Sequence, residues 1–327
     1  MNKEVQTQPE DIPFNRSFHG APGELVRLSP LVRRMVAGNA GPMTFTGTCT
    51  YVVGSGRVAV IDPGPDKPDH IAALIEALRG ETVAAILVTH THRDHSPGAR
   101  ALKLATGAKI IGCAPYRLPD DGASEFRLDA AHDLDHAPDA ILREGEAFEG
   151  ANFTLTCVET PGHAINHLAF ALPQENALFS GDHVMAWSTS VVAPPDGSMR
   201  DYMASLEKLR SRDDRIYWPG HGGPVNEPQR FVRALAHHRR QREQAILSSV
   251  RNGDATIAKI VARVYEGIDP ALRFAAGLSI FAHLEDLSAR GLIKVEGPAT
   301  LGALFRSADQ FLSTTASSAA SNVAILR

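Results

Sequence analysis

Three histidines and one aspartate stand close together in the stretch THTHRDH, which begins at Thr89. Neutral imidazoles and carboxylates are the ligands that zinc and similar metals favour. Side chains two residues apart point to the same side of an extended chain, so His90 and His92 can face one metal ion. A turn after them lets Asp94 and His95 face a neighbouring position. One short loop can therefore supply ligands to two adjacent metal ions.

The same stretch could also be a polar loop without a metal ion. Asp94 would then cap a helix that opens near Ser96 and Pro97. We favour the metal site, because crowding three imidazoles and an acid into one loop serves no packing need.

Three further loops carry histidine or aspartate directly after an apolar segment. His163 ends the stretch TPGH, Asp182 lies in SGDH, and His221 lies in PGHG. Proline and glycine enforce turns in these loops. Because ligands in layered α/β folds bind where strand ends leave loops, four such loops predict one convergent site.

Composition sets the broad class of protein. A length of 327 residues predicts about two domains. With 43% hydrophobic and 21% charged residues the chain is an ordinary globular protein, and a net charge of -4 gives no overall attraction to nucleic acid or anionic membranes. Cys49, Cys113 and Cys157 predict buried thiols rather than a disulfide framework. Neither a secretory signal nor a membrane-spanning run is visible, so we expect a cytoplasmic protein without a membrane partner.

Apolar periodicity and turn residues outline the elements that must position these loops. Strands are expected at about 25–28, 32–36, 48–53, 58–61, 84–88, 109–112, 153–159, 167–172, 177–179 and 215–218, and helices at 69–78, 98–106 and 200–211. Strands that alternate with helices indicate a layered α/β architecture. Residues 119–138 are interpreted as a surface insertion, in which we expect His132 and His136 to be solvated rather than to form a third metal site.

The chain changes character after Pro224. A long polar helix at 227–249, an amphipathic helix at 256–265, helical residues at 271–290 and a short strand at 291–295 outline a winged helix-turn-helix. We therefore expect a catalytic domain at 1–225, a connecting helix at 226–250, a winged-helix domain at 251–304 and a flexible tail at 305–327.

The order of the metal-binding motifs resembles that of the metallo-β-lactamase superfamily, over about Phe45 to Pro224. The stretches DHV at Asp182 and APPDG at Ala193, with the C-terminal part, are similar to the β-lactamase-like-protein-2 subgroup, which joins this fold to a winged-helix domain. Some members of that subgroup are endoribonucleases that act on single-stranded RNA. Cys49 departs from the asparagine that is frequent in relatives.

The resemblance implies an α+β fold, a four-layer αββα sandwich, followed by a small winged-helix domain. It also implies two metal ions per chain, which we expect to be zinc, with iron or manganese as alternatives. The first would be bound by His90, His92 and His163, the second by Asp94, His95 and His221, with Asp182 as the bridge.

We therefore expect a dinuclear zinc-dependent hydrolase in which a metal-bridging hydroxide attacks an ester, thioester or phosphodiester. Asp94 is the acid/base candidate. The partner would be a small ester or thioester, or single-stranded RNA if the chain is an endoribonuclease. From other classes, an iron-dependent oxidoreductase and a winged-helix nucleic-acid-binding regulator are the rivals. The winged helix is expected to cover the active-site face or to mediate a homodimer.

Several other polar residues have two interpretations. Asp62, Thr89 and Asn166 could orient imidazoles or simply end strands and turns. His183 is expected to be packed or solvated, and Trp187 and Tyr202 could line the cleft or the core. The basic run HHRRQR from His237 to Arg242 is expected to be a solvated helix face rather than a phosphate contact.

Overall fold

The computed structural model describes residues 12–18, 20–117 and 131–308. These residues divide into two compact units. The first contains the described residues up to 190 together with 201–236, and the second contains 191–200 and 237–308.

A seven-stranded sheet forms one half of the first unit, with the strands in sequential order. Its members are β1 (Val26–Arg27), β2 (Val32–Val36), β3 (Cys49–Ser55), β4 (Arg57–Ile61), β5 (Thr82–Val88), β6 (Lys109–Gly112) and β7 (Ala140–Ile141). The strands β1 to β4 are antiparallel, whereas β4 to β7 run parallel. After their exposed first residues, Arg57 and Thr82, the central strands β4 and β5 are apolar and almost entirely buried, as expected for parallel strands that are covered on both faces.

A second, five-stranded sheet has the order β12-β11-β10-β9-β8. Its members are β8 (Ala147–Glu149), β9 (Thr154–Glu159), β10 (Leu168–Leu172), β11 (Ala177–Gly181) and β12 (Ile216–Pro219), with a 3-10 turn at Pro173–Glu175. The strand β10 is antiparallel to both neighbours, and β12 is parallel to β11. Consequently β9, β11 and β12 all run in the same direction and end at the same edge of the sheet.

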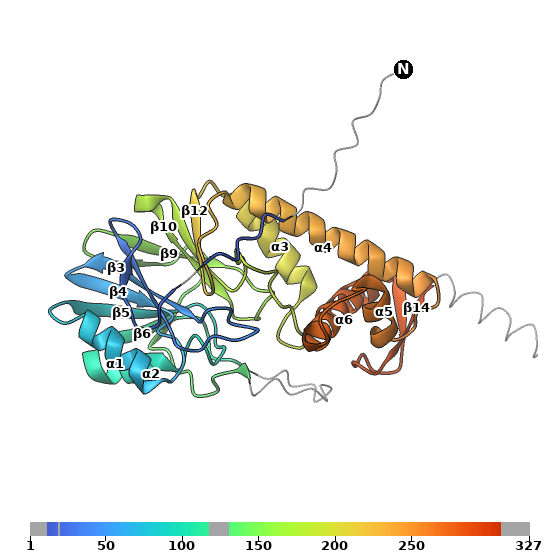
Figure 1. Ribbon diagram of the computed structural model, residues 1–327, viewed down its shortest axis with the longest axis horizontal. Coiled ribbons are helices and arrows are strands. Elements are labelled where there is room, and N and C mark those ends of the chain that lie inside the picture. The colour runs from blue at the N-terminus through green and yellow to red at the C-terminus, as the bar shows by residue number, and fades with distance from the viewer. Residues whose placement is uncertain (1–11, 19, 118–130, 309–327) are drawn as a thin grey trace, which may run out of the picture. The chain divides into compact units, whose positions relative to one another are not determined.

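The two sheets share one apolar core. Buried side chains from the first sheet, such as Tyr51, Ile61 and Leu87, belong to the same cluster as Phe170 and Phe179 of the second. Helices α1 (Pro68–Ala77) and α2 (Gly98–Thr106) lie side by side along the first sheet. Helix α3 (Met199–Arg210) lies on the side of the second sheet (Figure 1). The first unit is therefore the expected αββα sandwich.

The second unit is the expected winged helix. It contains α4 from His237 onward (the helix spans Pro228–Arg251), α5 (Ile257–Val264), a 3-10 turn at Pro270–Leu272, α6 (Arg273–Ala289) and the antiparallel pair β13 (Ile293–Glu296) and β14 (Leu304–Ser307). Thr256 caps α5 by accepting a hydrogen bond from the Lys259 amide. The core of this unit joins α4, α5, α6 and the strand pair through side chains such as Ile246, Ile260 and Phe305.

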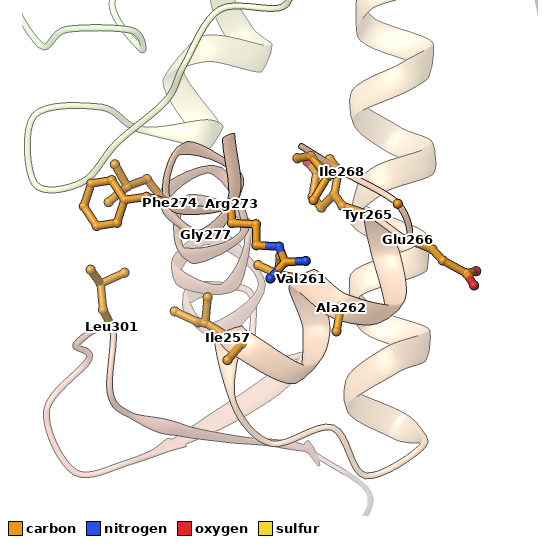
Figure 2. A pocket seen from close by; sticks show the side chains of 13 residues that line it. Ile257, Val261, Ala262, Tyr265, Glu266, Ile268, Arg273, Phe274, Gly277 and Leu301 are labelled. Carbon is orange, nitrogen blue, oxygen red and sulfur yellow. The ribbon is translucent and has the colours of Figure 1, made fainter. Parts of the chain in front are cut away.

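A pocket of about 580 Å³ opens on the winged-helix unit. Figure 2 shows its wall, which is built from α5, the turn after it, the start of α6 and Leu301. Most of the lining is apolar, and Arg273 and Glu266 are its charged residues. All of its lining residues belong to this unit.

The structure corrects several sequence-based expectations. His132 and His136 are buried rather than solvated, while residues 119–130 of the expected insertion lie outside the described residues. Within the basic run, Arg239 is buried and Arg242 donates a hydrogen bond to the Val264 carbonyl, so this run is not a continuous solvated face. The short strands β7, β8 and β14 were not predicted, and β14 occupies the start of the expected tail. Residues 309–327 of that tail lie outside the described residues.

Other expectations are confirmed. The three cysteines are free and buried. Each helix and strand predicted from the sequence is present, with ends displaced by a few residues at most. Among the residues that the structure describes, no helix is long and apolar enough to cross a bilayer.

A half-buried acid on α6 gives a test of the winged-helix unit. Burial raises the pKa of Glu285 from its ordinary value of 4.5 to about 7. Since the folded pKa lies above the unfolded one, folding favours the protonated form, and its contribution to stability is lost as pH rises from about 4.5 through 7. We expect Glu285→Gln to stabilise this unit by about 1 kcal/mol at pH 8, the shift being discounted for partial exposure, and to have little effect at pH 4.5.

Thermal unfolding of wild type and variant at the two pH values measures this difference. An equal gain at both values would contradict a desolvated carboxylate at this position.

Candidate metal centre

The loops that carry the seven candidate ligands meet at the ends of β5, β9, β11 and β12. In the first group, His92 Nδ1 lies 3.0 Å from both His90 Nε2 and His163 Nε2. These three ligand atoms lie within 4.8 Å of one another, a spacing that allows them to hold one metal ion.

A second group lies beside the first and contains Asp94, His95 and His221. Asp94 Oδ2 lies 3.1 Å from His221 Nε2 and 3.4 Å from His95 Nε2. The two imidazole Nε2 atoms are 3.3 Å apart. Two nitrogens and one carboxylate oxygen therefore converge on one point.

Asp182 lies between the two groups. Its Oδ2 is 3.7 Å from His163 Nε2 in the first group and 3.3 Å from His221 Nε2 in the second, and its Oδ1 is 3.5 Å from His95 Nε2. Oδ1 is buried, and among the described residues it has no hydrogen-bond donor. A buried carboxylate oxygen without a donor is costly unless a cation neutralises it.

The carboxylate of Asp62 fixes the proton positions of two imidazoles. Its Oδ2 accepts from the Thr89 hydroxyl at 2.7 Å and faces His95 Nδ1 at 3.0 Å. An ionised carboxylate only accepts, so Nδ1 of His95 carries the proton. The Thr89 hydroxyl donates its one proton to Asp62. It can therefore only accept from His90 Nδ1, which lies 2.9 Å away. In both rings Nε2 is therefore unprotonated, and its lone electron pair faces the centre.

The ring of His221 is held in the same way. Its Nδ1 lies 3.3 Å from the Gly47 carbonyl, which can only accept, so Nε2 again presents its electron pair. In these neutral tautomers the electron pairs of His95 and His221 face each other across 3.3 Å. A cation between them turns this repulsion into attraction, so the donor set fits a bound metal ion.

Buried charge supports this interpretation. Burial lowers the pKa of His221, but the Asp182 and Asp94 carboxylates outweigh it and raise that pKa to about 9. The pKa of His95 is likewise raised well above its ordinary value, against burial, by Asp94 and Asp182. The two carboxylates therefore favour a positive charge near the imidazoles of His95 and His221. Either a proton on an imidazole or a metal cation supplies that charge. Metal binding must displace such protons, so metal affinity falls with falling pH.

Gly220 leaves the space that the centre needs. A Cβ atom at this position would lie 2.3 Å from Asp182 Oδ1 and 2.7 Å from His95 Cε1. Gly220, interpreted from the sequence as a turn former in the stretch PGHG, thus also leaves room for the Asp182 carboxylate.

The remaining polar candidates have mixed outcomes. Asn166 donates to the Thr91 hydroxyl and the Ala114 carbonyl, so these contacts tie loops together rather than orient an imidazole. His183 is buried, with its ring 4.4 Å from that of Tyr202, as expected for a packed residue. Trp187 stacks on Phe45 at 4.9 Å.

Sequence reasoning missed the role of two histidines. His132 is stacked on Tyr116 at 3.7 Å, and its ring lies 4.9 Å from that of the candidate ligand His92. His167 is buried and bonds to the backbone of Asp182. Its spacing of four residues after His163 was the only available signal, whereas nothing in the sequence placed His132 near the centre.

Two family models match the chain. Residues 43–221 match the model described as the metallo-beta-lactamase superfamily, and residues 256–299 match the beta-lactamase associated winged helix domain. Similar proteins include a "Beta-lactamase-like protein 2 homolog" from Drosophila melanogaster, 33% identical over 83% of this chain and 92% of that protein. An "Atrochrysone carboxyl ACP thioesterase" from Aspergillus fumigatus is 30% identical over 74% of each chain.

Solved structures show the same fold. A metallo-beta-lactamase family protein from Thermus thermophilus superposes with a TM-score of 0.70 at 24% identity, over 86% of this chain and 100% of that chain. A beta-lactamase domain protein from Burkholderia ambifaria gives a TM-score of 0.74 at 18% identity, over 89% of this chain and 95% of that one.

The hydrogen bonds of Asp62 generate a prediction. In Asp62→Asn, an amide NH₂ facing His95 Nδ1 would push the imidazole proton onto Nε2 and remove the electron pair from the centre. We expect metal affinity to fall about 10–100-fold, as for other residues that orient metal-binding histidines. Competition with a chromophoric chelator measures the affinity, and Asp69→Asn, at an exposed position of α1, is the matched control. Equal affinities in the two variants would refute the orienting role.

Proposed function

Because this chain belongs to the metallo-beta-lactamase superfamily, and is therefore a metal-dependent hydrolase, we propose that it hydrolyses thioesters of small organic acids. We further propose that it does so with two divalent metal ions, zinc being the natural occupant. The observation that carries the proposal is the pair of three-donor groups on either side of Asp182.

The proposed ligands are the seven residues of the centre. His90, His92 and His163 would hold one ion, and Asp94, His95 and His221 the other. Asp182 would be shared, since its carboxylate approaches both groups. Imidazole and carboxylate donors with few solvent contacts suit zinc, and they also accept iron or manganese.

When bound, the metal ions supply a nucleophilic oxygen at neutral pH and stabilise negative charge on the carbonyl oxygen of the substrate. Asp94 is the proposed proton acceptor. Burial raises the pKa of Asp94, but His95 and His221 outweigh it and hold that pKa well below its ordinary value. Its carboxyl is therefore ionised at neutral pH, and it remains 26% exposed, so solvent reaches it.

A short chain of hydrogen bonds holds Asp94 in place. The Asn39 side-chain amide donates to the Thr48 hydroxyl at 2.9 Å, and that hydroxyl donates to Asp94 Oδ2 at 3.3 Å. Oδ2 is thus directed toward His221. The proton released by the attacking water would be taken up at this carboxylate and then passed to the leaving thiolate.

Two observations favour a thioester with an apolar acyl group. Relatives about 30% identical to this chain are named as acyl carrier protein thioesterases. In addition, Met43, Leu134 and Ile165 are large apolar side chains exposed on loops of the first unit. Met43 precedes Gly47, whose carbonyl faces His221, Ile165 follows His163 by two residues, and Leu134 follows His132 by two. Exposed apolar side chains close in sequence to residues of a site suit an organic group better than a phosphodiester backbone.

An RNA phosphodiester is the competing substrate. The basic run of α4 gives it little support, because Arg242 donates to Val264 and stacks over the Tyr265 ring at 4.5 Å. Iron-dependent oxidation is the other competitor, and metal analysis of the purified protein separates it from hydrolysis. We propose residues 1–225 as the catalytic domain, 226–250 as the connecting helix and 251–304 as the winged-helix domain, with the last strand β14 continuing that domain to Ser307.

The substrate class is tested with a panel of acyl thioesters, oxygen esters, lactones, phosphodiesters and short single-stranded RNA. We expect kcat/KM for apolar acyl thioesters to exceed that for phosphodiesters by about 100-fold or more. Zinc-loaded protein is assayed beside Asp94→Ala, which controls for contaminating activity. Faster turnover of RNA or phosphodiesters than of every thioester would overturn the proposed substrate class.

The bridging role is tested by Asp182→Asn. A neutral amide cannot neutralise two cations, so we expect the metal content to drop toward one ion per chain and kcat/KM to fall roughly 100-fold or more. Elemental analysis after gel filtration gives the metal content, with Asp69→Asn as the control. A variant with full metal content and full turnover would show that Asp182 does not bridge.

A further inference from the structure

His167 is a buried histidine outside the two donor groups. It directly precedes β10, is 1% exposed, and its ring lies 5.0 Å from that of His90 and 6.2 Å from that of His163. It therefore lies directly behind the proposed ligands without offering a nitrogen to them.

The hydrogen bonds of His167 define a single tautomer. The backbone amide of Asp182 donates to His167 Nε2 at 3.1 Å. A backbone N–H can only donate, so Nε2 carries no proton, and in the neutral ring the proton is on Nδ1. That proton is donated to the Thr160 hydroxyl at 2.8 Å. Both ring nitrogens are thus used in a chain that runs from Asp182 through His167 to Thr160.

The fold makes room for this contact. A Cβ atom at Gly181 would lie 2.5 Å from His167 Nε2, and Gly181 has a positive φ of 50°. Glycine at this position lets the imidazole reach the next amide and lets the chain turn there. On the other side, the Thr160 amide bonds to the His167 carbonyl at 3.0 Å, where the β9–β10 hairpin closes.

Two ligand loops are therefore tied together through one ring. Thr160 opens the loop that carries His163, while the bond to the Asp182 amide fixes the loop that begins at the end of β11. His163 Nε2 of the first loop and Asp182 Oδ2 of the second lie 3.7 Å apart.

We propose that His167 is a positioning residue of the metal centre, which sets the Asp182 carboxylate between the two donor groups by accepting a hydrogen bond from the Asp182 amide. The inference rests on the proposed metal centre but not on the proposed substrate. It predicts that the acceptor at the Nε2 position, rather than the volume of the ring, is what metal binding requires.

Two variants of matched size separate these requirements. In His167→Gln the side-chain carbonyl can accept from the Asp182 amide near the position of Nε2, whereas His167→Met has similar length and no comparable acceptor. We expect His167→Met to weaken zinc binding about 10–100-fold and His167→Gln to keep most of the affinity. Chelator competition measures affinity, and the visible spectrum of the cobalt(II)-loaded proteins reports ligand geometry.

Thermal unfolding of the metal-free proteins separates positioning from general stability. Equal zinc affinity in the Gln and Met variants, whatever their unfolding temperatures, would overturn the inference. A wild type that binds no divalent metal would instead overturn the proposed function, and the inference with it.

A second arm needs no change at His167. Thr160→Val removes the acceptor for the Nδ1 proton, whereas Thr160→Ser keeps a hydroxyl acceptor. We therefore expect zinc affinity to fall in the Val variant and to stay near the wild-type value in the Ser variant. Long-range ¹H–¹⁵N correlation of the imidazole in the wild type reads the tautomer directly. A proton on Nε2 would contradict the proposed hydrogen bond, even if every variant failed to fold.

Discussion

The metal centre depends on fixed proton positions in its imidazoles, and the Asp62 carboxylate is where that control begins. Asp62 accepts from the amide and hydroxyl of Thr89 and from His95 Nδ1, all within the buried interior. It adopts a φ of 48°, which is uncommon for a residue other than glycine. Three hydrogen bonds to one ionised group offset the backbone strain and leave two imidazole electron pairs facing inward.

Sheet geometry brings Asp62 to this place. The strand β4 pairs in parallel with β5, so Ile61 lies opposite Leu87, and the residues after them emerge at the same edge. The second sheet sends out β9, β11 and β12 in a common direction for the same reason. One shared apolar core holds the two edges together, so a site assembled from four distant loops has no need of a disulfide or a rigid insertion.

Much of this arrangement was predictable from the sequence, because the ligands follow apolar strands at turns that glycine and proline mark. His90, His163 and Asp182 could be placed at strand ends by pattern alone. The burial of individual side chains was not predictable in the same way. Segment 131–139 is rich in polar residues, yet it buries His132 against Tyr116, because its packing depends on contacts distant in sequence. The role of His167 also required coordinates, since a hydrogen bond to a backbone amide leaves no trace in residue types.

The winged-helix unit shows why a fold alone does not assign nucleic-acid binding. His283, a polar residue of α6, is buried, and burial together with Arg239 lowers its pKa to about 3. It is therefore uncharged at neutral pH and unsuited to contact phosphate. Arg242 is committed to the Val264 carbonyl and the Tyr265 ring. The contacts of Arg242 thus lie within the winged-helix unit itself, where the guanidinium satisfies a carbonyl near the end of α5 and covers an aromatic face, and its presence in the sequence is explained without a polyanionic partner.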